Sequence, residues 1–325
     1  MTAQRYGFGI LLVGSLIVVS SALAGPLHDA AKNGNLDQVK QLLARGADVN
    51  ATDEYYDTPL YLAVVGGRKD IAALLIAKGA NVNVMDAHHD TPLYLAVAGG
   101  HQDIAALLIA NGADVNLTGA SNSAPLYLAI AGGHQDIAAL LIANGADVNV
   151  ADEYHDTPLY LAVVGKDRKI TELLLVRGAD VNAKGSLGRP PLQEAITKGQ
   201  GDIAELLITQ GADMKTMDKD SDTLLHEAVA KGYRDVAQLL VAQGAHLDLK
   251  GNGDSTPLYQ AVARGHKDIA EFLLTQGADV NVANEYHGTP LHQAVAGGHK
   301  NLAALLIAQG ADVNAMNEYR ATPLY

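Results

Sequence analysis

The feature that most constrains this chain is a period of 33 residues that runs without interruption. A Gly-Ala-Asp-Val-Asn-like pentad begins at nine glycines spaced 33 residues apart, from Gly46 to Gly310. A Thr-Pro-Leu-like triad keeps the same step from Thr58 to Thr322. Because no insertion breaks the period, we expect one repeat domain over residues 25–325, without a linker or a second domain. The nine expected repeats are 25–57, 58–90, 91–123, 124–156, 157–189, 190–222, 223–255, 256–288 and 289–321, and residues 322–325 begin a tenth.

Each repeat has the pattern of two short helices followed by an extended loop. In repeat 58–90, Thr58 can cap a helix whose first residue is Pro59, and the pair Gly66–Gly67 can end it. Apolar residues at Ile71, Leu74, Leu75 and Ile76 form the stripe of a second helix. Helices of about nine residues are marginal alone in water, because nucleation outweighs so few propagation steps. We therefore predict an all-α solenoid in which neighbouring repeats stabilise one another.

Several repeats carry motifs that resemble the ankyrin repeat family. They are Thr-Pro-Leu-His at 289–292, Gly-His at 298–299 and Gly-Ala-Asp-Val-Asn at 310–314, and the resemblance covers residues 25–325. The resemblance implies an L-shaped repeat of two antiparallel helices, with a β-hairpin loop projecting at about a right angle. It also implies a concave face, made of hairpin tips and first helices, that binds another protein or peptide.

The expected tips share a pattern of acidic and aromatic residues, as in Asp-Glu-Tyr-Tyr-Asp at 53–57 and Asn-Glu-Tyr-His-Gly at 284–288. Tyrosine offers rigid contact area with a polar end, so the pattern suits recognition. It equally suits a solvated turn copied by duplication, and both readings stay open. Carried over from the resemblance, the expected tip contacts are Glu54, Tyr55, Asp57, Ala87, His88, Asp90, Glu153, Tyr154, Asp156, Glu285 and Tyr286. The expected groove floor is Val65, Ala98, Ala131, Val164, Ala230, Ala263 and Ala296, which with the acidic rim favours a basic or apolar partner segment.

The sequence departs from the family pattern at two positions. Tyrosine replaces histidine after Thr-Pro-Leu in five repeats (Tyr61, Tyr94, Tyr127, Tyr160, Tyr259). We expect it to fill space and bond to a nearby backbone group, with ligand stacking as the alternative. The family's glycine two residues before the threonine survives only at Gly188, and residues such as Tyr56 and Arg320 tolerate left-handed backbone poorly. These loops are therefore expected to use another turn type.

Composition and motifs argue against several classes of function. The net charge of −13 would repel nucleic-acid phosphates, and the absence of cysteine removes thiolate chemistry. No phosphate loop or nucleophile elbow is present, and exact repetition supplies the same few side chains each time. We expect neither an enzyme nor a cofactor. A metal-binding tip remains an alternative, with the local set Asp86, His88, His89 and Asp90 as its candidate.

The two ends of the chain suggest export and a possible contact between copies. Residues 1–24 combine a positive start at Arg5, a charge-free apolar stretch and small residues at Ala22 and Ala24, the layout of a secretory signal peptide. We expect export to the periplasm or the extracellular space, with an uncleaved membrane anchor as the alternative and no stable membrane insertion after cleavage. The last repeat lacks the polar outer face of a cap, so a homo-oligomeric scaffold formed through the C-terminal end is a further alternative.

Overall fold

The computed structural model describes residues 25–119, 123–186, 188–215 and 222–324. Within this part of the chain the structure is helical, with loops and turns between the helices and no β-strand. The helices are α1 Pro26–Asn33, α2 Leu36–Ala44, α3 Pro59–Val65, α4 Lys69–Ala77, α5 Pro92–Ala98, α6 Gln102–Ala110, α7 Pro125–Ala131, α8 Gln135–Ala143, α9 Pro158–Val164, α10 Arg168–Val176, α11 Pro191–Thr197, α12 Gly201–Thr209, α13 Leu224–Ala230, α14 Arg234–Ala242, α15 Pro257–Arg264, α16 Lys267–Thr275, α17 Pro290–Ala296 and α18 Lys300–Ala308, with one 3-10 turn, η2, at Asn252–Asp254.

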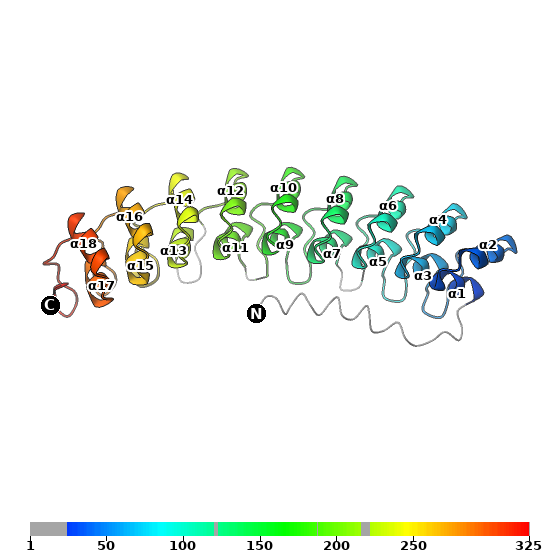
Figure 1. The fold of residues 1–325 in the computed structure, drawn as a ribbon, viewed down its shortest axis with the longest axis horizontal. Coiled ribbons are helices and arrows are strands. Elements are labelled where there is room, and N and C mark those ends of the chain that lie inside the picture. Colours follow the sequence, from blue (N-terminus) through cyan, green and yellow to red (C-terminus); the bar gives the residue numbers. More distant parts are fainter. Residues whose placement is uncertain (1–24, 120–122, 187, 216–221, 325) are drawn as a thin grey trace. The chain divides into compact units, whose positions relative to one another are not determined.

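The helices fall into two compact parts, one ending at Gly188 and one beginning at Arg189. In the first part, α1, α3, α5, α7 and α9 contact one another in chain order, and α2, α4, α6, α8 and α10 do the same. In the second part, α11, α13, α15 and α17 form one such row and α12, α14, α16 and α18 the other. Figure 1 shows the helix pairs of each part standing beside one another in sequence order. Each part is thus a two-layer stack of the helix-turn-helix repeats that the sequence predicts.

Local sequence explains where the first helices begin and end. The Thr58 hydroxyl accepts the backbone N–H of Tyr61, and Pro59 occupies the first helical position, where no N–H is needed. The same cap recurs at Thr91, Thr157 and Thr256. The apolar face is then completely buried, because Leu60 and its equivalent Leu93 are at most 1% exposed. Burial of one leucine side chain contributes about 1.5–3 kcal/mol, so these helices gain their stability from neighbouring repeats.

A row of asparagine side chains links the loops of successive repeats. The Asn50 amide donates to the Gly79 carbonyl at 3.1 Å, and its Oδ1 accepts the Asn81 N–H at 2.8 Å. Asn83, Asn116, Asn149 and Asn281 repeat both bonds to their own next repeats. Asp248 takes the same place and keeps the accepting bond, at 3.0 Å from Asp279 N, but a carboxylate has no amide to donate. We call this row the asparagine ladder. Within each part, it fixes these loops against the loops that follow them.

Glycine pairs between the helices leave room for a ring from the same and the following repeat. A methyl group placed on Gly99 would lie 2.9 Å from the ring of His101, and one on Gly100 would lie 2.8 Å from the ring of His134. Gly100 also has a φ of 66°, in the left-handed region that favours glycine. These histidine rings therefore occupy packed positions between repeats, which indicates a structural role for them.

Residues 1–24 lie outside the described residues, so the signal-peptide prediction has no structural counterpart. In the part of the chain that the structure describes, none of the helices has the length and apolar character needed to cross a bilayer.

The asparagine ladder gives a matched pair of stability predictions. Asn116→Asp should destabilise the chain by about 1 kcal/mol, because the donation to Gly145 O is lost. Asp248→Asn should stabilise it by about 0.5–1 kcal/mol, because the missing donor is supplied. Urea unfolding followed by circular dichroism measures both. Effects of the same sign for the two exchanges would contradict the ladder.

Helix capping offers a second matched pair of predictions. Within the helices, α5 and α7 have the same sequence except that Val97 of α5 corresponds to Ile130 of α7, a difference of one methylene group. Ala124 replaces the capping threonine of α7 and makes no side-chain cap bond, whereas Thr91 caps α5. Ala124→Thr should stabilise the protein by about 1 kcal/mol, and Thr91→Ala should cost about the same. Thermal unfolding midpoints that do not move in opposite directions would overturn this account of the caps.

Candidate functional site

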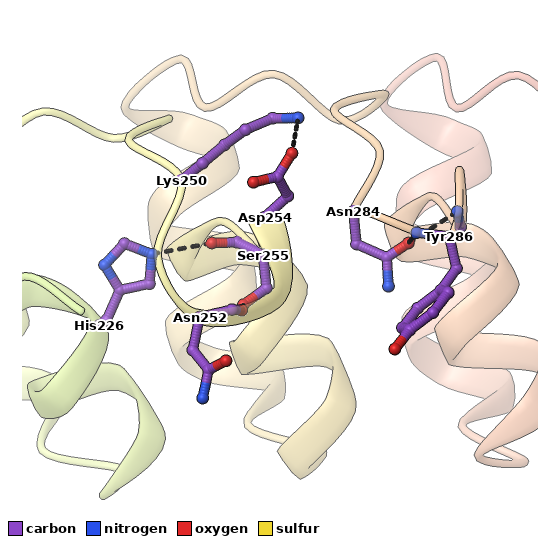
Figure 2. A network of polar contacts seen from close by, with 8 residues as sticks. His226, Lys250, Asn252, Asp254, Ser255, Asn284 and Tyr286 are labelled. Atoms are coloured by element: carbon purple, nitrogen blue, oxygen red, sulfur yellow. Dashed lines mark hydrogen bonds and ion pairs between the residues drawn. The ribbon is translucent and has the colours of Figure 1, made fainter. Parts of the chain in front are cut away.

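The expected tips are loops organised by one acidic or amide side chain. Asp53 Oδ1 accepts the backbone N–H groups of Tyr55 and Asp57, both at 2.9 Å, and its own N–H donates to the Asp57 carbonyl. Asp86, Asp152, Asn284 and Asn317 close their loops with the same three bonds. Figure 2 shows the Asn284 bond to the Tyr286 N–H. Because the side chain takes two N–H groups that a strand ladder would use, these hairpin-shaped loops contain turns and no strands.

The expectation of another turn type at the tips is wrong. Tyr56, His89, His155, His287 and Arg320 all adopt φ values between 56° and 68°, the left-handed conformation that Gly188 adopts at 69°. Left-handed backbone costs a non-glycine residue roughly 1–2 kcal/mol. The bonds to the loop-closing side chain, which flank this residue on both sides, offset that cost and hold the conformation without glycine.

Neighbouring tips are also joined by backbone hydrogen bonds. Ala87 N–H donates to Tyr55 O at 3.1 Å, Glu285 N–H to Gly253 O at 3.0 Å and Glu318 N–H to Tyr286 O at 3.0 Å. The loop at 250–255 is different in detail, since it contains η2 and a Lys250–Asp254 ion pair of 3.3 Å (Figure 2). The tips at 86–90, 284–288 and 317–321 are therefore fixed both internally and against the preceding tip.

The predicted contact residues mostly reach the surface. Tyr55, Tyr154 and Tyr286 are 46%, 56% and 54% exposed, which is high for tyrosine. The remaining tip residues Glu54, Ala87, His88, Glu153 and Glu285 are exposed, whereas Asp57 and Asp90 are half-buried. Of the predicted floor, Ala131 and Ala296 are exposed, and Val65, Ala98, Val164, Ala230 and Ala263 are half-buried. The floor residues lie at or near the C-terminal ends of the first helices.

Asp156 does not belong to this surface, contrary to the prediction. It is only 2% exposed, and its Oδ1 accepts the Ser186 N–H of the following loop at 2.6 Å. Asp222 makes the equivalent bond to Asn252 N at 2.9 Å. An aspartate at this position thus fixes the next tip, and it cannot contact a partner while that tip covers it.

The residues after Thr-Pro-Leu connect each first helix to the loops. Tyr61 Oη donates to Asp86 Oδ2 at 2.7 Å, so the expected local backbone partner is replaced by the loop-closing carboxylate at the end of the same repeat. Where histidine stands instead, its Nε2 donates to a backbone carbonyl: His226 to Ser255 at 3.0 Å (Figure 2) and His292 to Ala321 at 3.0 Å. These rings are hydrogen-bonded to the loops, which favours the structural role over ligand stacking.

Carboxylates gather between the first two tips. Burial, together with the charges of Asp53 and Asp86, raises the pKa of Asp57 to about 7 from 3.8. Burial and the bond to Asp86 also raise the pKa of Tyr61. In the next repeat, burial and the charge of Asp90 raise the pKa of Tyr94 to about 12. Around neutral pH, Asp57 therefore exchanges a proton while the two phenols stay protonated.

Two tip residues outside the predicted set belong to the same surface. Tyr319 is 80% exposed, and Glu318 is exposed beside it. Both line a cavity of about 460 Å³ together with the predicted residues Tyr286 and Ala296. The signal was present in the sequence, because Asn317-Glu318-Tyr319 repeats Asn284-Glu285-Tyr286 at the 33-residue step.

A metal site at the tips has no geometric support. Among the described residues, no group of three or more histidine, aspartate or glutamate side chains is placed to hold an ion. In the candidate set, both carboxylate oxygens of Asp86 already accept protein hydrogen bonds, from Tyr61 and from the loop backbone.

The pKa of Asp57 predicts how stability depends on pH. Between about pH 4 and about pH 7, native Asp57 holds a proton that the unfolded chain releases, so the free energy of unfolding should fall as pH rises through this window. Asp57→Asn should remove that fall and be more stable than the wild type at about pH 8. Glu172→Gln, at an exposed position of α10, is the control. Urea unfolding across this range checks it, and identical pH slopes for wild type and Asp57→Asn would contradict the assignment.

Comparisons with known proteins agree with this geometry. The family model described as "Ankyrin repeats (3 copies)" matches residues 27–119, 117–185, 167–251, 192–284 and 248–317. The crystal structure of the human ASB11 ankyrin repeat domain is similar, with a TM-score of 0.55 and 29% sequence identity over 69% of this chain and 99% of that one. A search of the curated proteins finds no match. Since the family model matches most of the sequence, the chain belongs to the ankyrin repeat family.

Proposed function

We propose that this protein binds a partner protein, without catalysis, through the tips and adjoining first helices within each of its two parts. Ankyrin repeats are generally protein–protein interaction modules and are typically non-enzymatic. The observation that carries the proposal for this chain is the repeated exposure of tyrosine at the tips, on loops that are fixed by their own hydrogen bonds.

Rigid, exposed aromatic residues are suited to recognition. Tyr55, Tyr154 and Tyr286 stand on loops closed by three hydrogen bonds each, so binding immobilises little backbone. Tyrosine itself has few rotatable bonds and a large contact area, and it is enriched among residues that dominate binding energy. Glutamates beside these tyrosines give the surface an acidic character, which favours a basic partner segment.

We also propose that residues 1–24 direct export, to the periplasm or the extracellular space. The positive start, the apolar stretch and the small residues before Gly25 support this proposal. Retention of the segment as a membrane anchor is the alternative. N-terminal sequencing of the protein recovered from a secreting host would separate them, because cleavage after Ala24 leaves Gly25 as the first residue.

Self-association is a second use that one observation favours. Val295 on α17, Ile307 on α18 and Leu324 are exposed apolar residues at 38%, 45% and 68%. Apolar side chains gathered near one end of a stack can meet a second copy. If these side chains bind a second copy, sedimentation velocity should show an increasing fraction of dimer as the protein concentration rises. An unchanged monomer over the whole range would exclude this use.

The binding proposal predicts that loss of the tip tyrosines weakens partner affinity. Peptides would first be selected from a displayed random library against the full chain, and their affinities measured by fluorescence anisotropy. The triple exchange Tyr55→Ala, Tyr154→Ala and Tyr286→Ala should weaken binding by at least about tenfold, as for residues that dominate an interface.

The matched control exchanges exposed apolar residues on the second helices. Val176→Ala and Ile307→Ala remove side chains that are 71% and 45% exposed but lie away from the tips. Their affinities should equal that of the wild type. If the control exchanges weaken binding and the tip exchanges do not, the second helices form the binding surface and the proposal is wrong.

A further inference from the structure

One place in the second part of the chain carries two identical tip motifs in succession. Asn284-Glu285-Tyr286 and Asn317-Glu318-Tyr319 lie 33 residues apart. The other Glu-Tyr tips are not followed by a second Glu-Tyr pair. The residue 33 positions after Tyr55 is His88, and the residue 33 positions after Tyr154 is Leu187. The cavity of about 460 Å³ lies between these two tips and α17.

The cavity combines aromatic walls with an apolar floor. Tyr286 and Tyr319 line it from the two tips, and both rings are largely exposed to solvent. Val295, Ala296 and Pro323 line it from α17 and the segment that follows the last tip. Two tyrosine faces can hold a cation through its attraction to the ring quadrupole, and the apolar residues can cover the methylene groups of a long side chain.

Most polar groups of the cavity are already engaged with one another. The Tyr259 hydroxyl donates to Gln293 Oε1 at 3.0 Å and accepts from Asn284 Nδ2 at 3.1 Å. The side-chain oxygens of Asn284 and Asn317 accept two backbone N–H groups each. These carboxamides therefore shape the cavity without offering strong acceptors to a ligand.

Negative charge remains available at its rim. Glu318 lines the cavity and Glu285 stands next to Tyr286, and each carboxylate interacts with the phenol beside it. The charge of Glu285 raises the pKa of Tyr286, and the bond to Glu318 raises that of Tyr319, so both phenols stay neutral. None of the described residues that line the cavity is lysine or arginine. A cation entering here would meet the Glu318 carboxylate, with no lysine or arginine side chain among the described lining residues to neutralise it.

We propose that this cavity binds an arginine side chain of the partner protein. The planar guanidinium stacks between Tyr286 and Tyr319 and donates to the Glu318 carboxylate, while its methylene stem lies over Val295 and Ala296. Arginine fits better than lysine because its planar group both stacks and forks onto a carboxylate. The inference rests on the proposed function, since it names the partner chemistry that one part of the tip surface selects.

The direct test uses a minimal probe, N-acetyl-arginine-N-methylamide, titrated against the full chain with ring-labelled tyrosine and followed by NMR. We expect saturable shifts of the Tyr286 and Tyr319 signals among the 13 tyrosines of the sequence. The neutral analogue N-acetyl-citrulline-N-methylamide should bind at least about fivefold more weakly, because it keeps the shape and loses the charge. Equal binding of the two probes would overturn the proposal.

Variants assign the roles of the residues. Glu318→Gln should weaken the arginine probe about fivefold, and Tyr319→Leu should do the same when read at Tyr286. The matched controls are Glu153→Gln and Tyr154→Leu, which alter the same motif where no second Glu-Tyr tip follows. These two controls should leave the affinity of the cavity for the arginine probe unchanged. The arginine site would be contradicted if the probe shifted the Tyr154 signal as strongly as the Tyr286 signal. It would also be contradicted if Glu318→Gln left the affinity for the probe unchanged.

The peptides selected against the full chain separate this inference from the binding function. If they lose affinity on alanine exchange of the tip tyrosines but tolerate arginine→citrulline exchange and Glu318→Gln, the protein-binding function stands and the arginine site fails. If the arginine probe binds as described while no peptide depends on the tip tyrosines, the site stands and the wider function fails.

Discussion

The shortness of its helices is the constraint on which the structure depends. The first helices contain seven or eight residues and the second helices nine. Among the described residues, none of these helices therefore reaches the length at which an isolated helix is stable in water. Stability must come from burial between repeats, which explains why Leu60, Leu93 and Leu126 are at most 1% exposed. The asparagine ladder and the rings over the glycine pairs then fix the register of one repeat on the next. Local and neighbouring interactions are inseparable in such a chain.

The residues that hold the repeats together are distinct from those that face solvent. At each Asp/Asn-Glu-Tyr tip, the side-chain oxygen of the first residue closes the loop, as Asp53 shows with two accepted N–H bonds. The next two residues, such as Glu54 and Tyr55, remain exposed. Phenols and imidazoles below the tips bind the loops rather than a ligand, as Tyr61 and His226 do. The tips thus leave very few exposed positions per repeat for the proposed binding, and the other tip residues belong to the scaffold.

Much of the fold could be predicted from the sequence because its signals are local. Thr58, Pro59 and Gly79 mark helix ends, and the structure places a cap, a first helical residue and a left-handed glycine there. The tip conformation could not be predicted in the same way. Tyr56 disfavours left-handed backbone by its own preference, yet it adopts a φ of 65° because its neighbours on both sides are bonded to Asp53.

The candidate surface shows a similar division. Exposed tyrosines followed from the tip pattern, and Tyr319 could have been included by the same pattern. Asp156 could not be recognised as buried, because its covering partner is Ser186 in the following loop, a contact between residues 30 positions apart. The aspartate at this place is half-buried or buried according to the loop that comes next, which no window of sequence around it describes.

The self-closed tip has an evolutionary consequence. Since one aspartate or asparagine is enough to shape the loop, the residues beyond it can be exchanged without retuning the helices below. Duplication of a repeat then copies a complete closed loop with its exposed residues, and later point changes can diversify those residues one position at a time. Two adjacent copies that keep the same letters, as Glu285-Tyr286 and Glu318-Tyr319 do, create a composite feature that neither copy possesses alone.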